Sequence, residues 1–238
     1  MSGYAPKPIA PHDRLIFALD VATADEARAW IDRLGDSVRF YKIGMELLTS
    51  GDYFTVLGEL DRRGKQVFVD LKFLDVPATV AAAVKGLTRW PVSLCTLHSS
   101  SRAMLEAAAA VKGGIRLLAV TVLTSFDQAD LADLAIITPI AELVPQRARF
   151  ALDCGIDGVV CSGQELPALR AQVDHRLLTV CPGIRPVSLG DDQKRTVDVA
   201  QAFASGADYI VVGRPIRQAA EPRAAAEAIQ ASIAAAIQ

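Results

Sequence analysis

The sequence has no long apolar run, no excess of basic charge and no closely spaced cysteine pair. No stretch approaches the ~18 consecutive apolar residues of a membrane-spanning helix. The 25 basic and 27 acidic residues give a net charge of -2, which disfavours a nucleic-acid-binding surface. Single basic side chains can still bind an anionic ligand. These absences argue against a membrane protein and against a nucleic-acid-binding protein.

The cysteines are scattered along the chain and show no CxxC or CxxxC spacing. They are Cys95, Cys154, Cys161 and Cys181. No signal-like apolar stretch stands near the N-terminus, and disulfides persist mainly in oxidising compartments. We therefore expect reduced cysteines, most of them in the core, in a cytoplasmic protein.

Histidine is scarce too, and its positions argue against a metal centre. Only His98 follows a predicted strand, whereas His12 and His175 fall in the N-terminal segment and in a polar segment. A metal-dependent sugar-phosphate epimerase would need several histidine and carboxylate ligands that converge on one ion. We expect His98 to be a hydrogen-bonded rim residue, and Ser99–Ser101 to cap a helix rather than supply a nucleophile.

Short β-branched runs alternate with alanine-rich amphipathic segments along almost the whole chain. Most of these runs are continuously apolar, as expected of parallel strands that are covered on both faces. The predicted strands are Leu15–Leu19, Val38–Ile43, Gln66–Leu71, Val92–Leu97, Arg116–Val122, Gly158–Cys161, Leu177–Cys181 and Tyr209–Val212.

Predicted helices lie between these strands. Thr23 with Glu26, and Ser162 with Glu165, match the capping-box pattern of helix N-termini. Apolar residues, Trp30 among them, recur at helical spacing. We interpret these stripes as core packing rather than as cofactor contacts, because helices usually bury one face.

The alternation predicts a single (β/α)8 barrel domain. Eight strand-then-helix units in about 230 residues suit this fold, which typically takes ~250 residues. A doubly wound open sheet is the alternative, but no G-x-G-x-x-G turn follows the first strand and no composition shift marks a second domain. We expect the barrel over residues 12–238, preceded by a flexible arm over the proline-rich residues 1–11.

Polar residues follow most of the predicted strands, where barrel enzymes carry their chemistry. They include Asp20, Lys42, Asp70, Lys72, His98, Thr121, Thr124 and Ser125. Side chains alternate along a strand, so Asp70 and Lys72 share a face, with Lys42 beside them on the neighbouring strand. We expect an alternating row of Lys42, Asp70, Lys72 and Asp75. A salt-bridged rim is the simpler explanation, but four alternating charges at adjacent strand ends favour a functional site.

A second cluster, after the last two predicted strands, is suited to an anion. These loops read "CPGIRPVSLGDDQKR" and "VVGRPIRQ", and barrels often bind phosphate in these two loops. Gly213 permits close backbone approach, and Arg214 offers a planar fork to phosphate oxygens. Arg185 and Gln193 lie in the longer loop, which we expect to fold over a ligand.

The stretch "FVDLKFLDVPAT" at residues 68–79 resembles the D-x-K-x-x-D-[IV]-x-x-T signature of the orotidine 5'-phosphate decarboxylase family. The segments "FALDV", "YKIG", "VTVLTS", "CPGIRP", "DDQKR" and "YIVVGRPI" match it in the expected order over nearly the whole chain. The resemblance implies a cofactor-free (β/α)8 barrel that forms a homodimer. It also implies conversion of orotidine 5'-phosphate to UMP and CO2 in pyrimidine synthesis.

The resemblance also implies a role for each matching residue. Asp70 would lie beside the substrate carboxylate, and Lys72 would be the proton donor. Asp75 and Thr79 would reach the partner's site across the dimer interface. The implied substrate-binding residues are Asp20 and Lys42 at the ribose, Thr124 at the pyrimidine, Pro182, and at the phosphate end Arg185, Gln193, Gly213 and Arg214.

The chain departs from the commoner bacterial pattern at Leu74, Ala78 and Val187, where His, Asn and Gln are frequent. Two other interpretations remain open. One is a metal-dependent sugar-phosphate decarboxylase or aldolase of the same barrel group, which shares D-x-K-x-x-D. The other is a catalytically silent barrel that only binds a phosphorylated ligand.

Overall fold

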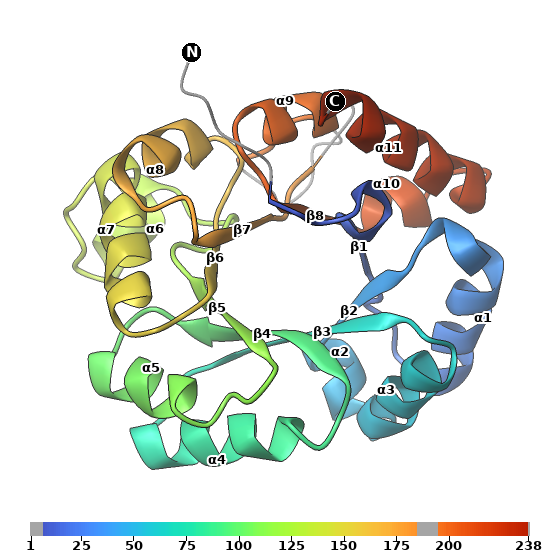
Figure 1. Ribbon diagram of the computed structural model, residues 1–238, viewed down its shortest axis with the longest axis horizontal. Coiled ribbons are helices and arrows are strands. Elements are labelled where there is room, and N and C mark those ends of the chain that lie inside the picture. The colour runs from blue at the N-terminus through green and yellow to red at the C-terminus, as the bar shows by residue number, and fades with distance from the viewer. Residues whose placement is uncertain (1–6, 185–194, 238) are drawn as a thin grey trace.

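The computed structural model describes residues 7–184 and 195–237. Within these residues eight parallel strands close into a barrel in chain order, with helices around it (Figure 1). The (β/α)8 fold expected from the sequence is therefore confirmed. The strands are β1 Leu15–Ala18, β2 Phe40–Gly44, β3 Gln66–Phe73, β4 Val92–His98, β5 Arg116–Val120, β6 Gly158–Val160, β7 Leu178–Cys181 and β8 Tyr209–Val212.

Helices follow the strands and form the outer layer (Figure 1). No helix among the described residues is long and apolar enough to cross a membrane. The helices are α1 Ala24–Leu34, α2 Met45–Thr49, α3 Tyr53–Arg62, α4 Pro77–Leu87, α5 Arg102–Ala109, α6 Gln128–Asp133, α7 Ile140–Asp153, α8 Leu166–Gln172, α9 Val199–Ala204, α10 Arg214–Arg217 and α11 Pro222–Ala236, with short 3-10 helices η1 Pro11–Asp13 and η2 Gly35–Ser37.

The predicted capping boxes form only in part. Thr23 accepts a hydrogen bond from the Glu26 amide at 3.2 Å, but the Glu26 carboxylate accepts from Ala22 instead of the cap. Ser101 caps α5 as expected, by accepting from the Met104 amide. Helix α8 begins at Leu166, so the pair of Ser162 and Glu165 lies just before it and serves another contact, described below.

Two apolar clusters make up the core. One lies inside the barrel and the other between the barrel and the helices. The inner cluster is Ile16, Ala18, Phe40, Phe68, Leu94, Leu118, Leu178, Val180, Tyr209 and Val211. At Gly158 a Cβ atom would stand 2.7 Å from both Leu118 and Leu178, so this close packing requires glycine. The filled interior leaves the carboxyl ends of the strands as the place for a site.

The amino end of the barrel is held by a buried charge cluster. Asp208 is fully buried and accepts hydrogen bonds from Lys7 at 2.8 Å and from Arg170 at 2.9 Å. Arg14 donates to the carbonyl oxygens of Lys7 and Ile9. Residues 7–11 of the arm that was expected to be flexible are therefore anchored to the barrel. The sequence did not indicate this, because Asp208, the ion-pair partner of Lys7, lies far away along the chain.

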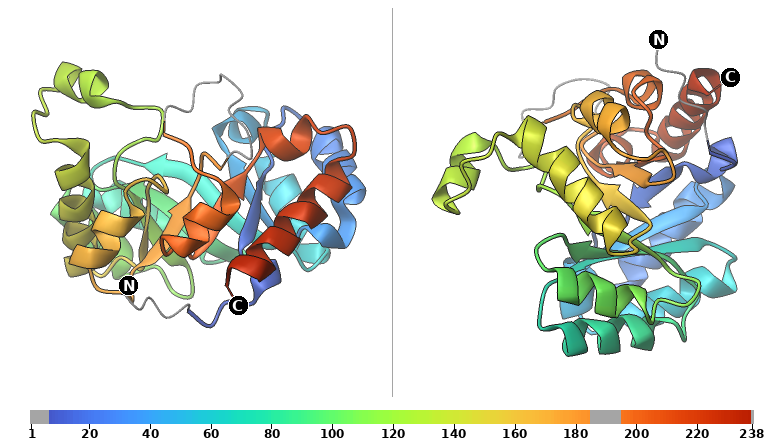
Figure 2. Two further views of the ribbon diagram at one scale, coloured as in Figure 1. Left: turned by 90° about the horizontal axis from the view of Figure 1, so that it is seen from above. Right: turned by 60° about the vertical axis from the view of Figure 1, so that its left-hand side comes forward.

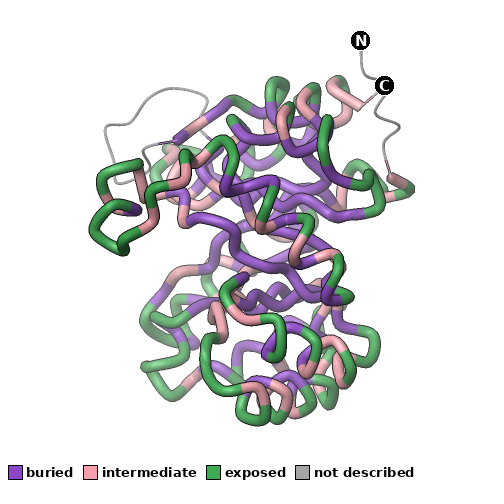
Figure 3. The backbone as a smooth tube through the Cα atoms, turned by 90° about the vertical axis from the view of Figure 1, so that its left-hand side faces the viewer, coloured by how far each residue is buried: buried purple, intermediate pink, exposed green. Residues whose placement is uncertain are grey.

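The connection between β5 and α7 stands out from the barrel and carries the short helix α6 (Figure 2). Exposed residues gather around α6 (Figure 3), and the apolar Leu134 and Ile137 are among them. A capping box of Asp127 and Asp130 starts α6, with each side chain bonded to the other's backbone amide. This box was not predicted from the sequence.

Candidate active site

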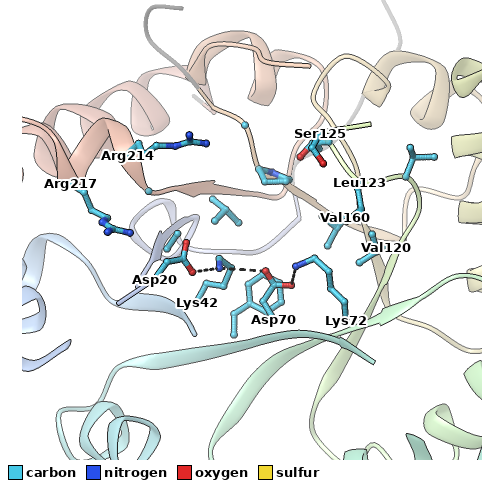
Figure 4. Close-up of a pocket in the computed structure, with 18 of the residues that line it drawn as sticks. Asp20, Lys42, Asp70, Lys72, Val120, Leu123, Ser125, Val160, Arg214 and Arg217 are labelled. Atoms are coloured by element: carbon cyan, nitrogen blue, oxygen red, sulfur yellow. Dashed lines mark hydrogen bonds and ion pairs between the residues drawn. The ribbon is translucent and has the colours of Figure 1, made fainter. Parts of the chain in front are cut away.

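A cavity of about 700 Å³ lies at the carboxyl ends of the strands (Figure 4). Its walls come from strands at both ends of the chain and from the loops that follow them. The lining residues are Ala18, Asp20, Trp30, Lys42, Phe68, Asp70, Lys72, Val120, Val122, Leu123, Thr124, Ser125, Val160, Pro182, Gly183, Val211, Gly213, Arg214, Arg217 and Gln218. Four of these are basic and two are acidic, which suits an anionic ligand.

A row of alternating charges crosses the floor of this cavity (Figure 4). The Lys42 ammonium lies 2.8 Å from Asp20 and 3.5 Å from Asp70. The Lys72 ammonium lies 2.9 Å from the other oxygen of Asp70. Because β1, β2 and β3 are neighbours in the barrel, three strand ends bring the four side chains together.

Asp75 stands outside this row within the chain. Strand β3 ends at Phe73, and the chain then turns, so that the Asp75 carboxylate accepts from the Val76 amide at 2.6 Å. Asp75 and Thr79 are both exposed and do not line the cavity. The row expected to end at Asp75 is instead completed at its other end by Asp20.

Ion pairing keeps the buried members of the row charged. Burial opposes ionisation of Asp70. The charges of Lys42 and Lys72, with hydrogen bonds from Lys72 and Thr96, outweigh this effect and lower the pKa of Asp70. Burial likewise opposes the charge on Lys42, yet Asp70 and Asp20 raise its pKa above the usual value. Removing either partner would leave an uncompensated buried ion, which is strongly destabilising.

The backbone at Lys72 is unusual for a strand. Its φ angle is +50°, a left-handed conformation that residues other than glycine seldom adopt. The pairing of β3 with β4 also shifts between Val69 and Phe73. Strand alternation alone therefore does not explain how Lys72 comes to face Asp70, and this irregularity was not predicted.

The predicted phosphate end lies across the cavity from Lys72 (Figure 4). Pro182, Gly213 and Arg214 all line the cavity, as the resemblance implied. A Cβ atom at Gly213 would stand 3.2 Å from the Cβ of Ala18, so a larger residue would crowd β1. Arg185 and Gln193, and the departure at Val187, lie outside the described residues.

Several residues that line the cavity were not predicted from the sequence. Arg217 lies one turn after Arg214 on α10, and this spacing is a signal that was present in "GRPIRQ". Trp30 was assigned to core packing, and its ring does pack on Phe17. It also lines the cavity. Thr124 lines the cavity as expected, and Ser125 joins it there.

His98 lies at the end of β4 and is half-buried, outside the cavity lining. Burial lowers its pKa, and the positive charges of Lys72 and Arg147 lower it further. The hydrogen bond expected for its ring is absent among the described residues. Within the described part of the chain, no group of three His, Cys, Asp or Glu side chains is arranged to hold a metal ion.

Comparison with known proteins identifies the family to which this barrel belongs. A model of the "Orotidine 5'-phosphate decarboxylase / HUMPS family" matches residues 13–229. The chain belongs to this family. It is 61% identical over 234 residues to the orotidine 5'-phosphate decarboxylase of Xanthomonas campestris pv. campestris strain 8004, covering 98% of this chain and 96% of that protein. It is 60% identical to the enzyme of the same name from Xanthomonas euvesicatoria pv. vesicatoria strain 85-10, covering 98% and 97%.

Solved structures agree with the family assignment. The crystal structure of orotidine 5'-phosphate decarboxylase from Lactobacillus acidophilus superposes with a TM-score of 0.81 at 34% identity, covering 93% of this chain and 99% of that one. An uncharacterized conserved protein from Geobacillus kaustophilus gives 0.79 at 33% identity, covering 92% and 99%. The family's barrel is therefore present over nearly the whole chain.

Proposed function

We propose that this chain decarboxylates orotidine 5'-phosphate to UMP and CO2, a step of pyrimidine biosynthesis, with Lys72 as the proton donor. The observation that carries the proposal is the Lys72 ammonium, held 2.9 Å from Asp70 in a cavity whose other end carries Arg214. A substrate with a carboxylate at one end and a phosphate at the other matches this distribution of charge. The curated relatives of about 60% identity carry the name of this activity.

The chemistry explains why a buried ammonium is needed. When the bond between C6 and the carboxylate breaks, the electron pair stays on C6 in an in-plane orbital that the ring π-system does not delocalise. A fixed positive charge next to C6 stabilises this pair electrostatically. The Lys72 ammonium then gives its proton to C6, and the neutral amine regains a proton from solvent.

Asp70 has a supporting role in this proposal. Its carboxylate accepts from the Lys72 ammonium and is flanked by Lys42, so the positive charges are held in place before the substrate arrives. Groups that are already oriented need not reorganise during the reaction, and we assign the larger part of the rate gain to this preorganisation. Repulsion between Asp70 and the substrate carboxylate is the smaller contribution in this proposal.

The rest of the cavity binds and orients the substrate. Asp20 and Lys42 would hold the ribose hydroxyls, and Thr124 would contact the pyrimidine ring. Arg214 would bind the phosphate together with Gly213. Arg185 and Gln193 are further implied phosphate ligands, and Pro182 is an implied substrate contact. Binding energy from a phosphate far from C6 can be used to orient the reacting ring.

We further propose a homodimer in which Asp75 and Thr79 complete the partner's site. Both are exposed and lie away from the chain's own cavity. Leu74 and Val76 flank Asp75 and are about 60% exposed, so together they offer an apolar surface that a partner would cover. A cytoplasmic location is part of the same proposal, supported by four buried free cysteines.

The direct test is to mix the purified protein with orotidine 5'-phosphate and follow the loss of its ultraviolet absorbance. We expect turnover that EDTA leaves unchanged, and UMP and CO2 in equal amounts. Lys72→Ala should abolish turnover while UMP still binds, because the cation at C6 is lost and the rest of the cavity stays. Wild-type turnover in this variant would rule out Lys72 as the acid, and inhibition by EDTA would favour the metal-dependent sugar-phosphate enzymes.

A further inference from the structure

We propose that Thr96 is a positioning residue that sets the geometry of Lys72 and Asp70 through a single hydroxyl group. The Thr96 hydroxyl accepts a hydrogen bond from the Lys72 backbone amide at 2.9 Å. It donates its own proton to Oδ1 of Asp70 at 3.0 Å. The inference rests on the proposed function, since it assigns Thr96 to the same reaction.

The backbone opposite Thr96 explains why this hydroxyl is needed. Val69 pairs with Cys95 and Phe73 with Leu97, so the three residues from Asp70 to Lys72 lie opposite Thr96 alone. Such a bulge breaks the regular ladder of hydrogen bonds. The Lys72 amide then bonds to the Thr96 side chain in place of a strand carbonyl. Thr96 therefore fills the gap in the ladder that the bulge opens.

The bulge also carries strain. A left-handed conformation in a residue other than glycine costs about 1–3 kcal/mol and persists only when the surrounding structure enforces it. Lys72 adopts this conformation, with φ at +50°. The hydrogen bond from its amide to Thr96 is a contact that holds it there. Without that bond, a relaxed backbone would point the Lys72 side chain in another direction.

The second hydrogen bond fixes the partner of Lys72. Oδ1 of Asp70 accepts from both the Lys72 ammonium and the Thr96 hydroxyl. Thr96 is fully buried, so no water takes the place of its hydroxyl if it is removed. One side chain thus holds the backbone of the proposed acid and the carboxylate that orients its ammonium.

Thr96 does not line the cavity, so its effect must pass through Lys72 and Asp70. This separates two kinds of kinetic change. Substrate binding depends on residues such as Arg214 that remain in place, whereas the chemical step depends on where the ammonium points. A displacement of about 1 Å at a reacting group can cost roughly 100-fold in rate.

The test compares Thr96→Val, which keeps the shape and removes the hydroxyl, with Thr96→Ser, which restores the hydroxyl. For Thr96→Val we expect kcat to fall roughly 10- to 100-fold while KM changes less than about threefold. For Thr96→Ser we expect kcat within about threefold of wild type, because serine offers the same donor and acceptor. Wild-type kcat in Thr96→Val, or equal loss in both variants, would overturn the inference.

The matched control is Thr179→Val at the opposite end of the barrel. Thr179 is equally buried, and its hydroxyl accepts from Arg170 at 2.8 Å and donates to the Gly206 carbonyl at 3.1 Å. Its loss should lower stability with kcat unchanged. If both valine variants lose kcat in proportion to lost stability, Thr96 is only structural and the inference is wrong.

A measurement without substrate keeps the inference separate from the proposed function. We expect the Lys72 amide hydrogen to exchange with solvent at least about tenfold faster in Thr96→Val, but not in Thr179→Val, as followed by NMR. Failure of wild-type protein to decarboxylate orotidine 5'-phosphate would overturn the proposed function alone. Unchanged exchange at Lys72 in Thr96→Val would overturn the role of Thr96 alone.

Discussion

At the scale of single residues, the proposed function assigns chemistry to one end of the cavity and substrate binding to the other. At one end of the cavity, Lys72 is held by direct contact with Asp70, in a row whose charges alternate. The other end carries Arg214 and Arg217 on one short helix. Substitutions at the first end should change kcat, and substitutions at the second should change KM.

Arg214 provides the test at the binding end. We expect Arg214→Ala to raise KM at least about 100-fold, because the proposed bidentate contact between its guanidinium and the substrate phosphate would be lost. Added guanidinium ion should restore part of the activity, since it can occupy the vacated space. Arg217→Ala is the comparison, and we expect a smaller rise in KM and no rescue. Steady-state kinetics with orotidine 5'-phosphate measures both, and an unchanged KM in Arg214→Ala would contradict the assignment.

His98 gives a prediction about pH. Its folded pKa lies below 6.5, through burial first and then through Lys72 and Arg147. Between the folded pKa and 6.5 the unfolded chain binds a proton that the folded chain does not, so stability falls as pH drops through this window. We expect His98→Gln to lose less stability than wild type between pH 7 and pH 5, measured by urea unfolding. An identical pH dependence in both proteins would show that His98 is not responsible.

At the scale of the elements, three loops around the cavity are joined by one buried ion pair. Arg195, just before α9, pairs with Glu165, and its guanidinium donates to the Leu123 carbonyl at 2.9 Å. The Ser162 hydroxyl donates to the Arg195 carbonyl at 3.0 Å. The loops after β5, β6 and β7 are thereby held together, and Leu123 lines the cavity.

Arg195→Met tests this connection. Burial raises the pKa of Glu165 despite its pairing with Arg195, so removing the arginine leaves a carboxyl group that is costly to ionise. We expect a loss of about 3–5 kcal/mol in the free energy of unfolding. The double variant Glu165→Met with Arg195→Met should recover part of this stability. We expect a raised KM in both the single and the double variant, because the loops are no longer joined. Recovery of KM along with stability would show that the pair has no part in shaping the cavity.

The sequence predicted the strands well because parallel strands buried on both faces are continuously apolar. It predicted Lys42, Asp70 and Lys72 of the charge row for the same reason, since charges at the ends of such strands are conspicuous, but it placed Asp75 in the row where the structure has Asp20. The bulge at Lys72 was not predictable, because it depends on Thr96, a partner on another strand. The anchoring of Lys7 by Asp208 was missed likewise, since contacts between distant positions leave no periodic pattern.

At the scale of the whole molecule, the barrel separates stability from chemistry. The cluster around Asp208 lies at the amino ends of the strands, where the Thr179 amide donates to the Asp208 carboxylate just before β7 pairs with β8. The charge row lies at the carboxyl ends, with the packed inner cluster between them. In (β/α)8 barrels, residues at the amino ends of the strands serve stability, and residues at the carboxyl ends serve catalysis.

Asp208→Asn tests this separation. Asparagine leaves Arg170 and Lys7 without their buried anion, so we expect a loss of about 3–5 kcal/mol in denaturant unfolding. The kcat of the folded fraction should stay at the wild-type value. Glu227→Gln, which removes an exposed pair with Arg223 at 3.1 Å, is the control and should cost less than about 1 kcal/mol. A fall in kcat for Asp208→Asn would show that the two ends of the barrel are coupled.

The anchoring of Lys7 has a practical consequence for handling the protein. The chain is fastened beside β7 and β8 at the floor of the barrel, facing away from the mouth through which a nucleotide would arrive. An affinity label or a solid support attached close to this lysine would therefore lie on the side of the barrel opposite the charge row. Protein tethered in this way should process substrate as fast as protein in solution, whereas attachment through α6 would crowd the open side.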